Sequence, residues 1–217
     1  VFFIMHIPSR QTEKQEAFLY NYDMIGNQMV NAGALHQMLK PYKAHLITGH
    51  THYNLNVVFD ENLMEHNTAA VCGTWWKADI CLDGTPRGYG IYEVNDNDVK
   101  WYYKSSGYPK EHQFRSYPVG ASKEHPSDII ANVWNWDKLW KVEWLEDGQL
   151  MGNMTRYTGL DPYASVVCSD REKMVYTWIT PRPTQHMFRA TPKNKDAHIT
   201  VKVTDRFGKE YIQTINP

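Results

Sequence analysis

Two histidines separated by one residue follow an apolar segment, and this arrangement constrains the chain more than any other feature. Residues 44–48 have the composition of a buried strand, and Gly49-His50-Thr51-His52 follows them directly. Both imidazoles can turn toward one point only if the backbone leaves the sheet there. Glycine permits that turn because it has no Cβ to clash. The sequence therefore indicates a pair of histidines at a strand end.

A second apolar segment ends in the same way. Residues 1–5 have the pattern of a buried strand, and His6 follows them. In α/β folds the carboxyl ends of the strands form one edge, where ligand sites lie. Imidazole is a ligand for borderline metals such as zinc, iron and manganese. We therefore predict that His6, His50 and His52 are metal ligands at one edge of a sheet.

These motifs resemble those of the calcineurin-like metallophosphoesterases. In that family a lone histidine after one strand and a Gly-His-x-His after a later strand are the last two metal-binding motifs. The resemblance covers essentially the whole chain, and it points to a bacterial subgroup that carries an extra C-terminal β-domain. The further segments that carry it are Cys72-Gly-Thr-Trp-Trp76, Asp83-Gly-Thr-Pro-Arg-Gly-Tyr89, Asn132-Val-Trp-Asn-Trp136 and Val203-Thr-Asp-Arg-Phe-Gly208.

The resemblance implies a centre of two divalent ions (manganese, iron or zinc) that hydrolyses small phosphate mono- or diesters through a metal-activated water. His6 and His50 would bind one ion and His52 the other. Tyr53 and Asn54 follow the motif directly, so we expect them to contact substrate or to support the ligands. Related bacterial proteins are often exported, and the resemblance therefore favours a periplasmic or exported location.

The family's first three motifs are missing from this chain. They are Asp-x-His, Gly-Asp-x-x-Asp and Gly-Asn-His followed by an acid, and all belong upstream of His6. The chain has no Gly-Asp pair, and Asp196-Ala-His198 lies in a C-terminal strand pattern, where we read it as coincidence. We therefore interpret the chain as the C-terminal part of such a protein, with no catalytic residue of its own.

The ligand set limits what this part can do alone. Two cations about 3.5–4 Å apart form the centre of two-metal hydrolases, and their repulsion calls for a carboxylate between them. Three neutral imidazoles supply no negative charge. We therefore expect that this chain alone is inactive and holds either no metal ion or one weakly bound ion.

The element pattern predicts an α/β part followed by a β part. Residues 1–106 are expected to be the C-terminal portion of an α/β/β/α sandwich, 107–117 a linker, and 118–217 a β-sandwich. The first part has patchy helical character near 14–20, a helix over 31–42 and strands over 44–48, 55–59, 69–76, 78–82, 88–94 and 99–103. The predicted strands of the second part cover 140–144, 149–154, 166–167, 174–179, 186–190, 198–203 and 210–215.

Composition excludes several classes of function. A net charge of −1 and a pI near 6.9 argue against a broad basic surface for nucleic acid. The chain has no run of 18 apolar residues that could span a membrane. Cys72 and Cys81 could form a disulfide in an exported protein or remain thiols. If part of a sheet is missing, bare edge strands would favour pairing between copies of the chain.

Aromatic residues leave one alternative open. Trp134, Trp136, Trp140, Trp144 and Trp178 could form a platform for a sugar or another flat ligand, although their spacing favours a packed core. The alternative function is a non-catalytic β-sandwich module that docks a glycan, a protein or the cell envelope. A third possibility is a regulatory partner that completes the site of another protein. The presence of the missing motifs upstream would favour the enzyme.

Overall fold

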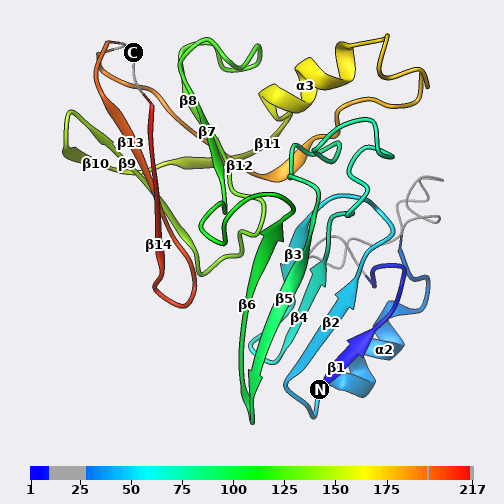
Figure 1. Ribbon diagram of the computed structural model, residues 1–217. Helices are drawn as coiled ribbons and strands as arrows, with labels where there is room; N and C mark the ends of the chain where they lie inside the picture. Colours follow the sequence, from blue (N-terminus) through cyan, green and yellow to red (C-terminus); the bar gives the residue numbers. More distant parts are fainter. Residues whose placement is uncertain (10–27, 195, 216–217) are drawn as a thin grey trace.

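The computed structural model describes residues 1–9, 28–194 and 196–215, and Figure 1 shows how they are arranged. Within these residues the chain is mainly β, with three four-stranded sheets, a two-stranded hairpin and the short helices α2 (Ala32–Leu39) and α3 (Pro162–Ser169). None of the helices in this part of the chain has the length and apolarity needed to cross a bilayer.

The first sheet contains the strands that precede the candidate ligands. Its order is β1-β2-β4-β3; β1, β2 and β4 are parallel, and β3 is antiparallel to β4. The bounds are Phe2–Ile4 for β1, Ala44–Thr48 for β2, Leu55–Val58 for β3 and Leu63–Asn67 for β4. The predicted strands at 1–5, 44–48 and 55–59 are confirmed, whereas β4 was not predicted. The prediction that residues 1–5 form a buried strand is wrong, because β1 lies at the edge of the sheet and Phe2, Phe3 and Ile4 are exposed.

Helix α2 packs on this sheet. Leu39 is buried in a cluster that also contains Ala44, Leu46 and Leu63. The helix predicted over 31–42 is therefore confirmed, with slightly shorter bounds. The helical character predicted near 14–20 lies outside the described residues.

A long hairpin joins the first sheet to the rest of the molecule. It consists of β5 (Gly88–Asn95) and β6 (Asp98–Ser105), which pair along their whole length, and it confirms the strands predicted over 88–94 and 99–103. Figure 1 shows it beside the first sheet. Trp101 of the hairpin packs against Val58 and Met64 of that sheet, which fixes the position of the hairpin.

Residues 69–82 form turns, so the strands predicted over 69–76 and 78–82 are wrong. The apolar run in this segment suggested strands. The chain instead doubles back at Gly73, where an added Cβ would lie 2.7 Å from the carbonyl oxygen of Ala78. The apolar side chains are still buried, because Cys81 packs in a cluster with Tyr103 and Trp134.

The second half of the chain consists of two four-stranded sheets that share one core. One sheet has the order β11-β12-β8-β7, and the other has the order β10-β9-β13-β14. The bounds of the first are β7 Arg115–Tyr117, β8 Ile129–Asn132, β11 Thr155–Gly159 and β12 Thr184–Ala190. Those of the second are β9 Lys141–Glu146, β10 Gln149–Asn153, β13 Ile199–Thr204 and β14 Glu210–Ile215.

The tryptophans of this half are mostly structural. Trp140 and Trp144 lie in the core that the two sheets share, and Trp134 is fully buried. Trp136 packs against the same core from its edge. The packing interpretation is confirmed for these residues, whereas Trp178 is 53% exposed.

Two predicted strands in this half are wrong. Residues 166–167 belong to α3, although β-branched valine favours strands. Asp161 begins this helix by accepting a hydrogen bond from the Ala164 amide at 2.8 Å, and Pro162 suits the first turn. Residues 174–179 form no strand. β7 lies inside the stretch expected as a linker; the domain boundaries themselves stay a prediction.

Buried polar contacts join the two halves. The Asp83 carboxylate accepts a hydrogen bond from the backbone amide of Asn54 at 3.0 Å and lies 3.3 Å from Nε2 of His186. Asn132 donates to the Asp83 carbonyl at 2.9 Å and lies 2.7 Å from Nδ1 of His186. Since Asp83 and Asn132 begin two of the segments that carry the resemblance, those segments meet in this network.

Candidate metal site at the sheet edge

The parallel pairing of β1 and β2 brings two of the three predicted ligands together. Ile4 pairs with Ile47, and the Gly49 amide donates to the His6 carbonyl at 3.0 Å, so both strands end at the same edge. Nε2 of His6 lies 2.9 Å from Nδ1 of His50. Their ring centroids are 4.8 Å apart at a steep interplanar angle. The structure therefore brings His6 and His50 together, while the role of His6, His50 and His52 as metal ligands stays a prediction.

His52 lies close enough to this pair for the charge of both rings to act on it. Its Nδ1 is 3.8 Å from Sγ of Cys72, and its ring stacks on Trp75 with centroids 4.8 Å apart. Burial lowers the pKa of His52, and positive charge at His50 lowers it further. Both effects favour the neutral ring, which is the form that binds a metal ion.

The backbone at the motif is strained. His50 has φ of 70° and His52 has φ of 58°. Residues other than glycine rarely adopt positive φ, and each such residue costs on the order of 1–3 kcal/mol. Such strain persists only where the surrounding structure holds it in place, and it occurs preferentially at functional sites. The two strained residues are two of the predicted ligands.

The buried Glu65 on β4 ties the two histidine-bearing segments together. Its Oε1 accepts from Oγ1 of Thr48 at 2.8 Å and from the Ser9 amide at 2.8 Å, and its Oε2 accepts from the Ser9 hydroxyl. Thr48 is the last residue of β2, and Ser9 follows His6 by three positions. The sequence analysis missed Glu65, although a carboxylate within a strand is a signal in itself.

Asn67, at the end of β4, holds the loop that contains the motif. Its side-chain nitrogen donates to Oγ1 of Thr51 at 2.6 Å and to the Tyr53 carbonyl at 3.0 Å. The side chain is buried, so these bonds form in a dry environment where leaving them unmade would be costly. The loop geometry thus depends on β4, which the sequence analysis did not predict.

The two predicted substrate residues lie in different environments. Tyr53 is half-buried within the motif loop. Asn54 is 3% exposed, and its side-chain nitrogen donates to the Trp134 carbonyl at 2.6 Å. Asn54 therefore connects the loop to the second half of the chain, and Tyr53 stays a predicted substrate contact.

The separation of the His6 and His50 nitrogens is compatible with shared binding of one metal ion, and equally with a hydrogen bond between the two rings. Nitrogen ligands about 2.0–2.1 Å from a metal ion lie roughly 3.0–3.4 Å from each other, close to the observed 2.9 Å. In residues 1–9, 28–194 and 196–215, no group of three or more histidine, cysteine or acidic side chains could hold a metal ion. The described residues therefore supply a pair of ligands, with His52 beside them.

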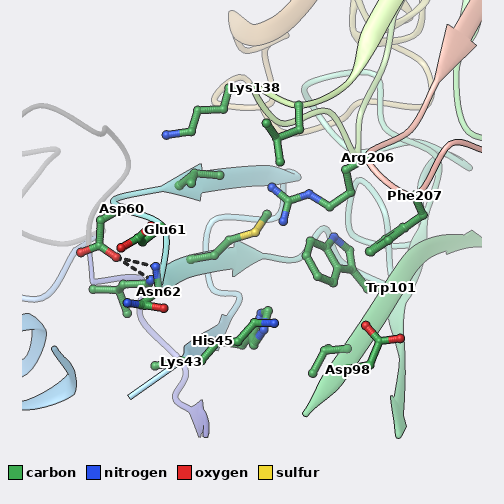
Figure 2. Close-up of a pocket in the computed structure, with 16 residues that line it drawn as sticks. Lys43, His45, Asp60, Glu61, Asn62, Asp98, Trp101, Lys138, Arg206 and Phe207 are labelled. Carbon is green, nitrogen blue, oxygen red and sulfur yellow. Dashed lines mark hydrogen bonds between the residues drawn. The ribbon is translucent and has the colours of Figure 1, made fainter. Parts of the chain in front are cut away.

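A cavity of about 430 Å³ lies at the opposite end of the same strands, where β2 and β4 begin. Figure 2 shows the residues that line it. Both basic and acidic side chains line it: Lys43, Lys138, Arg206, Asp60, Glu61 and Asp98. His45 in its wall is buried, and Nδ1 lies 3.0 Å from Nε2 of His66. Burial and the nearby Lys43 lower the pKa of His45 to about 4. The mixed charge of the lining indicates no particular ligand.

The cysteines are free thiols. Cys72 is half-buried, while Cys81 and Cys168 are buried, and none forms a disulfide. Burial raises the pKa of the Cys81 thiol, and the negative charge of Asp83 raises it further. Of the two states left open for Cys72 and Cys81, the structure has the reduced one.

The fold and this edge define a β-rich protein whose parallel strands end in a loop with contacting histidines. The family model described as the C terminal of calcineurin-like phosphoesterase matches residues 65–211, more than half of the chain. The chain belongs to this family, which confirms the resemblance. The matched region begins at Glu65, so His6, His50 and His52 lie outside it. Searches of curated proteins and of solved structures found no match.

Proposed function

We propose that the chain is the C-terminal part of a metal-dependent phosphoesterase that hydrolyses phosphate mono- or diesters. The observation that carries this proposal is the 2.9 Å separation of the His6 and His50 nitrogens at the edge of parallel strands. Family membership supports the reaction class. In this proposal the first sheet with α2 corresponds to the end of an α/β/β/α sandwich, and the paired second-half sheets form a β-sandwich domain.

His6 and His50 would hold one divalent ion and His52 the second, with manganese, iron and zinc all suited to imidazole. When bound, such ions activate a water molecule and neutralise charge on the phosphoryl oxygens. The chain's own residues orient the rings: Glu65 fixes the two strand ends, and Asn67 fixes the loop. The remaining ligands, including a bridging carboxylate, would come from outside the described residues.

Further parts of the proposal follow from the resemblance. The substrate is a small phosphoester, the location is periplasmic or exported, and the 217-residue chain alone is inactive. A phosphodiester assay on bis(p-nitrophenyl) phosphate with added Mn²⁺ should show no turnover, since three imidazoles cannot offset the repulsion between two dications. Brisk turnover would contradict the inactivity of the isolated chain.

Metal binding is tested by the paramagnetic effect of Mn²⁺ on histidine ring signals in NMR spectra. We expect Mn²⁺ to broaden the signals of His6 and His50 at concentrations that leave those of His198 sharp. The double variant with His6→Ala and His50→Ala should lose the effect on the remaining His52. His198→Ala is the matched control, because His198 is exposed in the second half. Equal broadening of all exposed histidines would refute the proposed site.

A further inference from the structure

Aromatic side chains from two distant segments meet beside His52. The ring of Trp75 stacks on His52, and the ring of Trp178 packs edge-on against Trp75 with centroids 4.7 Å apart at 90°. Tyr176 lies against Trp178 with centroids 5.6 Å apart. We call Trp75, Trp178 and Tyr176 the aromatic corner. It begins at a predicted metal ligand and extends outward along the surface.

The rings of the aromatic corner are exposed although their segments are anchored. Trp75 is 37% exposed, Trp178 53% and Tyr176 51%. The segment that carries Tyr176 and Trp178 is fixed on both sides by Met174 and Ile179, which are buried in one cluster. Aromatic side chains bury large areas and dominate cores. Rings held in solvent on an anchored segment therefore provide a preformed surface for stacking.

Backbone strain is concentrated at the same place. Trp75 has φ of 46° and Trp76 has φ of 64°, in addition to the positive φ values of His50 and His52. Bulky residues with positive φ are genuine outliers. The other non-glycine residues with positive φ in the described ranges are Asp96 and Asp147, which lie in hairpin turns, where aspartate tolerates this conformation. The strained bulky residues thus gather around the histidines and the aromatic corner.

We infer that the aromatic corner binds a planar aromatic ring in the organic group of the phosphoester substrate. This inference rests on the proposed function, which places the phosphoryl group at the histidines. His52 and Trp75 are in direct ring contact, so a small molecule that carries both a phosphate and an aromatic ring can reach the histidines and the aromatic corner together. Stacking on an aromatic side chain requires only a flat face.

The test uses three probes that separate the ring from the phosphate: adenosine, AMP and ribose 5-phosphate. NMR spectra of the 217-residue chain report on each indole N–H. Without added metal, adenosine and AMP should shift the signals of Trp75 and Trp178, and ribose 5-phosphate should leave them unchanged. Trp178→Ala should weaken adenosine binding roughly 5- to 150-fold, the range expected for one stacked base.

Two variants control for loss of structure. Trp178→Phe keeps an aromatic face and should retain most of the affinity for adenosine. Tyr42→Ala removes another exposed ring, 52% exposed and outside the aromatic corner, and should change nothing. If adenosine shifts neither the Trp75 nor the Trp178 signal, the inference is overturned, even where Mn²⁺ still broadens His6 and His50. If adenosine binds and Mn²⁺ does not, the proposed function fails while the ring site stands.

Discussion

Asp83 and His186 lie 103 residues apart in the sequence, yet Oδ2 of Asp83 is 3.3 Å from Nε2 of His186 in a fully buried contact. The same carboxylate accepts from the Asn54 amide and from the Thr85 hydroxyl. One buried acid therefore holds the loop after the histidine motif, a turn of the first half and a strand of the second half.

Asp83→Ala should lower the free energy of unfolding by about 3 kcal/mol, because buried donors lose their acceptor and are left without partners. Chemical denaturation followed by tryptophan fluorescence measures this difference. Asp98→Ala is the matched control, since the Asp98 side chain is 65% exposed at the start of β6, and its effect should stay within about 0.5 kcal/mol. Equal effects of the two substitutions would mean that Asp83 does not join the halves.

Gly84→Ala should be far more damaging than Gly148→Ala, although both glycines have φ of +81°. A Cβ on Gly84 would lie 2.1 Å from Cγ of Asp161, whereas a Cβ on Gly148 would meet nothing within 4 Å. The Gly148→Ala variant should be destabilised only by the unfavourable positive φ, by on the order of 1 kcal/mol. The midpoint of urea unfolding for the two variants checks this, and similar midpoints would contradict the close approach.

Acid should destabilise the protein between about pH 6.5 and pH 4. Burial lowers the pKa of His112 to about 4, with the positive charge of Arg115 adding to the effect. The unfolded chain therefore binds a proton at His112 before the folded chain does. Its contribution to stability is complete above about pH 6.5, is lost progressively as the pH falls, and becomes constant below about pH 4.

His112→Phe isolates this contribution, since the phenyl ring can keep the stacking on Tyr108 while removing the titration. Between pH 7 and pH 4 the wild-type protein should lose up to about 3 kcal/mol more than the variant does. Urea unfolding at each pH measures the difference. Parallel pH curves for the two proteins would show that His112 does not contribute.

Glu65→Ala should disturb the positions of His6 and His50 through the segments that carry them. The segments that carry His6 and His50 lose their shared acceptor, so we expect lower stability, by about 3 kcal/mol, and a loss of the Mn²⁺ effect on both rings. Glu65→Gln keeps one acceptor oxygen and should be milder. Glu61→Ala, on an exposed turn nearby, serves as the control. Unchanged ring signals of His6 and His50 in Glu65→Ala would argue against a positioning role.

The sequence analysis predicted the strands that end at the histidines because apolar runs and the motif glycine give strong local signals. His6, His50 and His52 were all expected at one edge, since parallel strands share an edge, and the structure joins the His6 and His50 rings by a direct contact. It missed β4, whose residues include Glu65 and Asn67. Buried polar side chains interrupt the apolar pattern there, and their hydrogen bonds to Thr48 and Thr51 are formed only in the folded chain.

Other misses have a similar origin. The apolar segment 69–76 suggested a strand. The close approach of Gly73 to the Ala78 carbonyl, which requires a turn, exists only in the folded chain. In α3, the capping by Asp161 outweighed the strand preference of the valines. The aromatic corner could not be predicted, because Trp75 and Trp178 are distant in sequence and share no pattern.

The hydrogen bond from the Asn54 side-chain amide to the Trp134 carbonyl means that the β-rich second half supports the loop that contains the histidine motif. A protein shortened to end before residue 118 would leave that amide without its acceptor and the loop without its backing. We therefore expect that the two halves have to be inherited, expressed and engineered together in one chain.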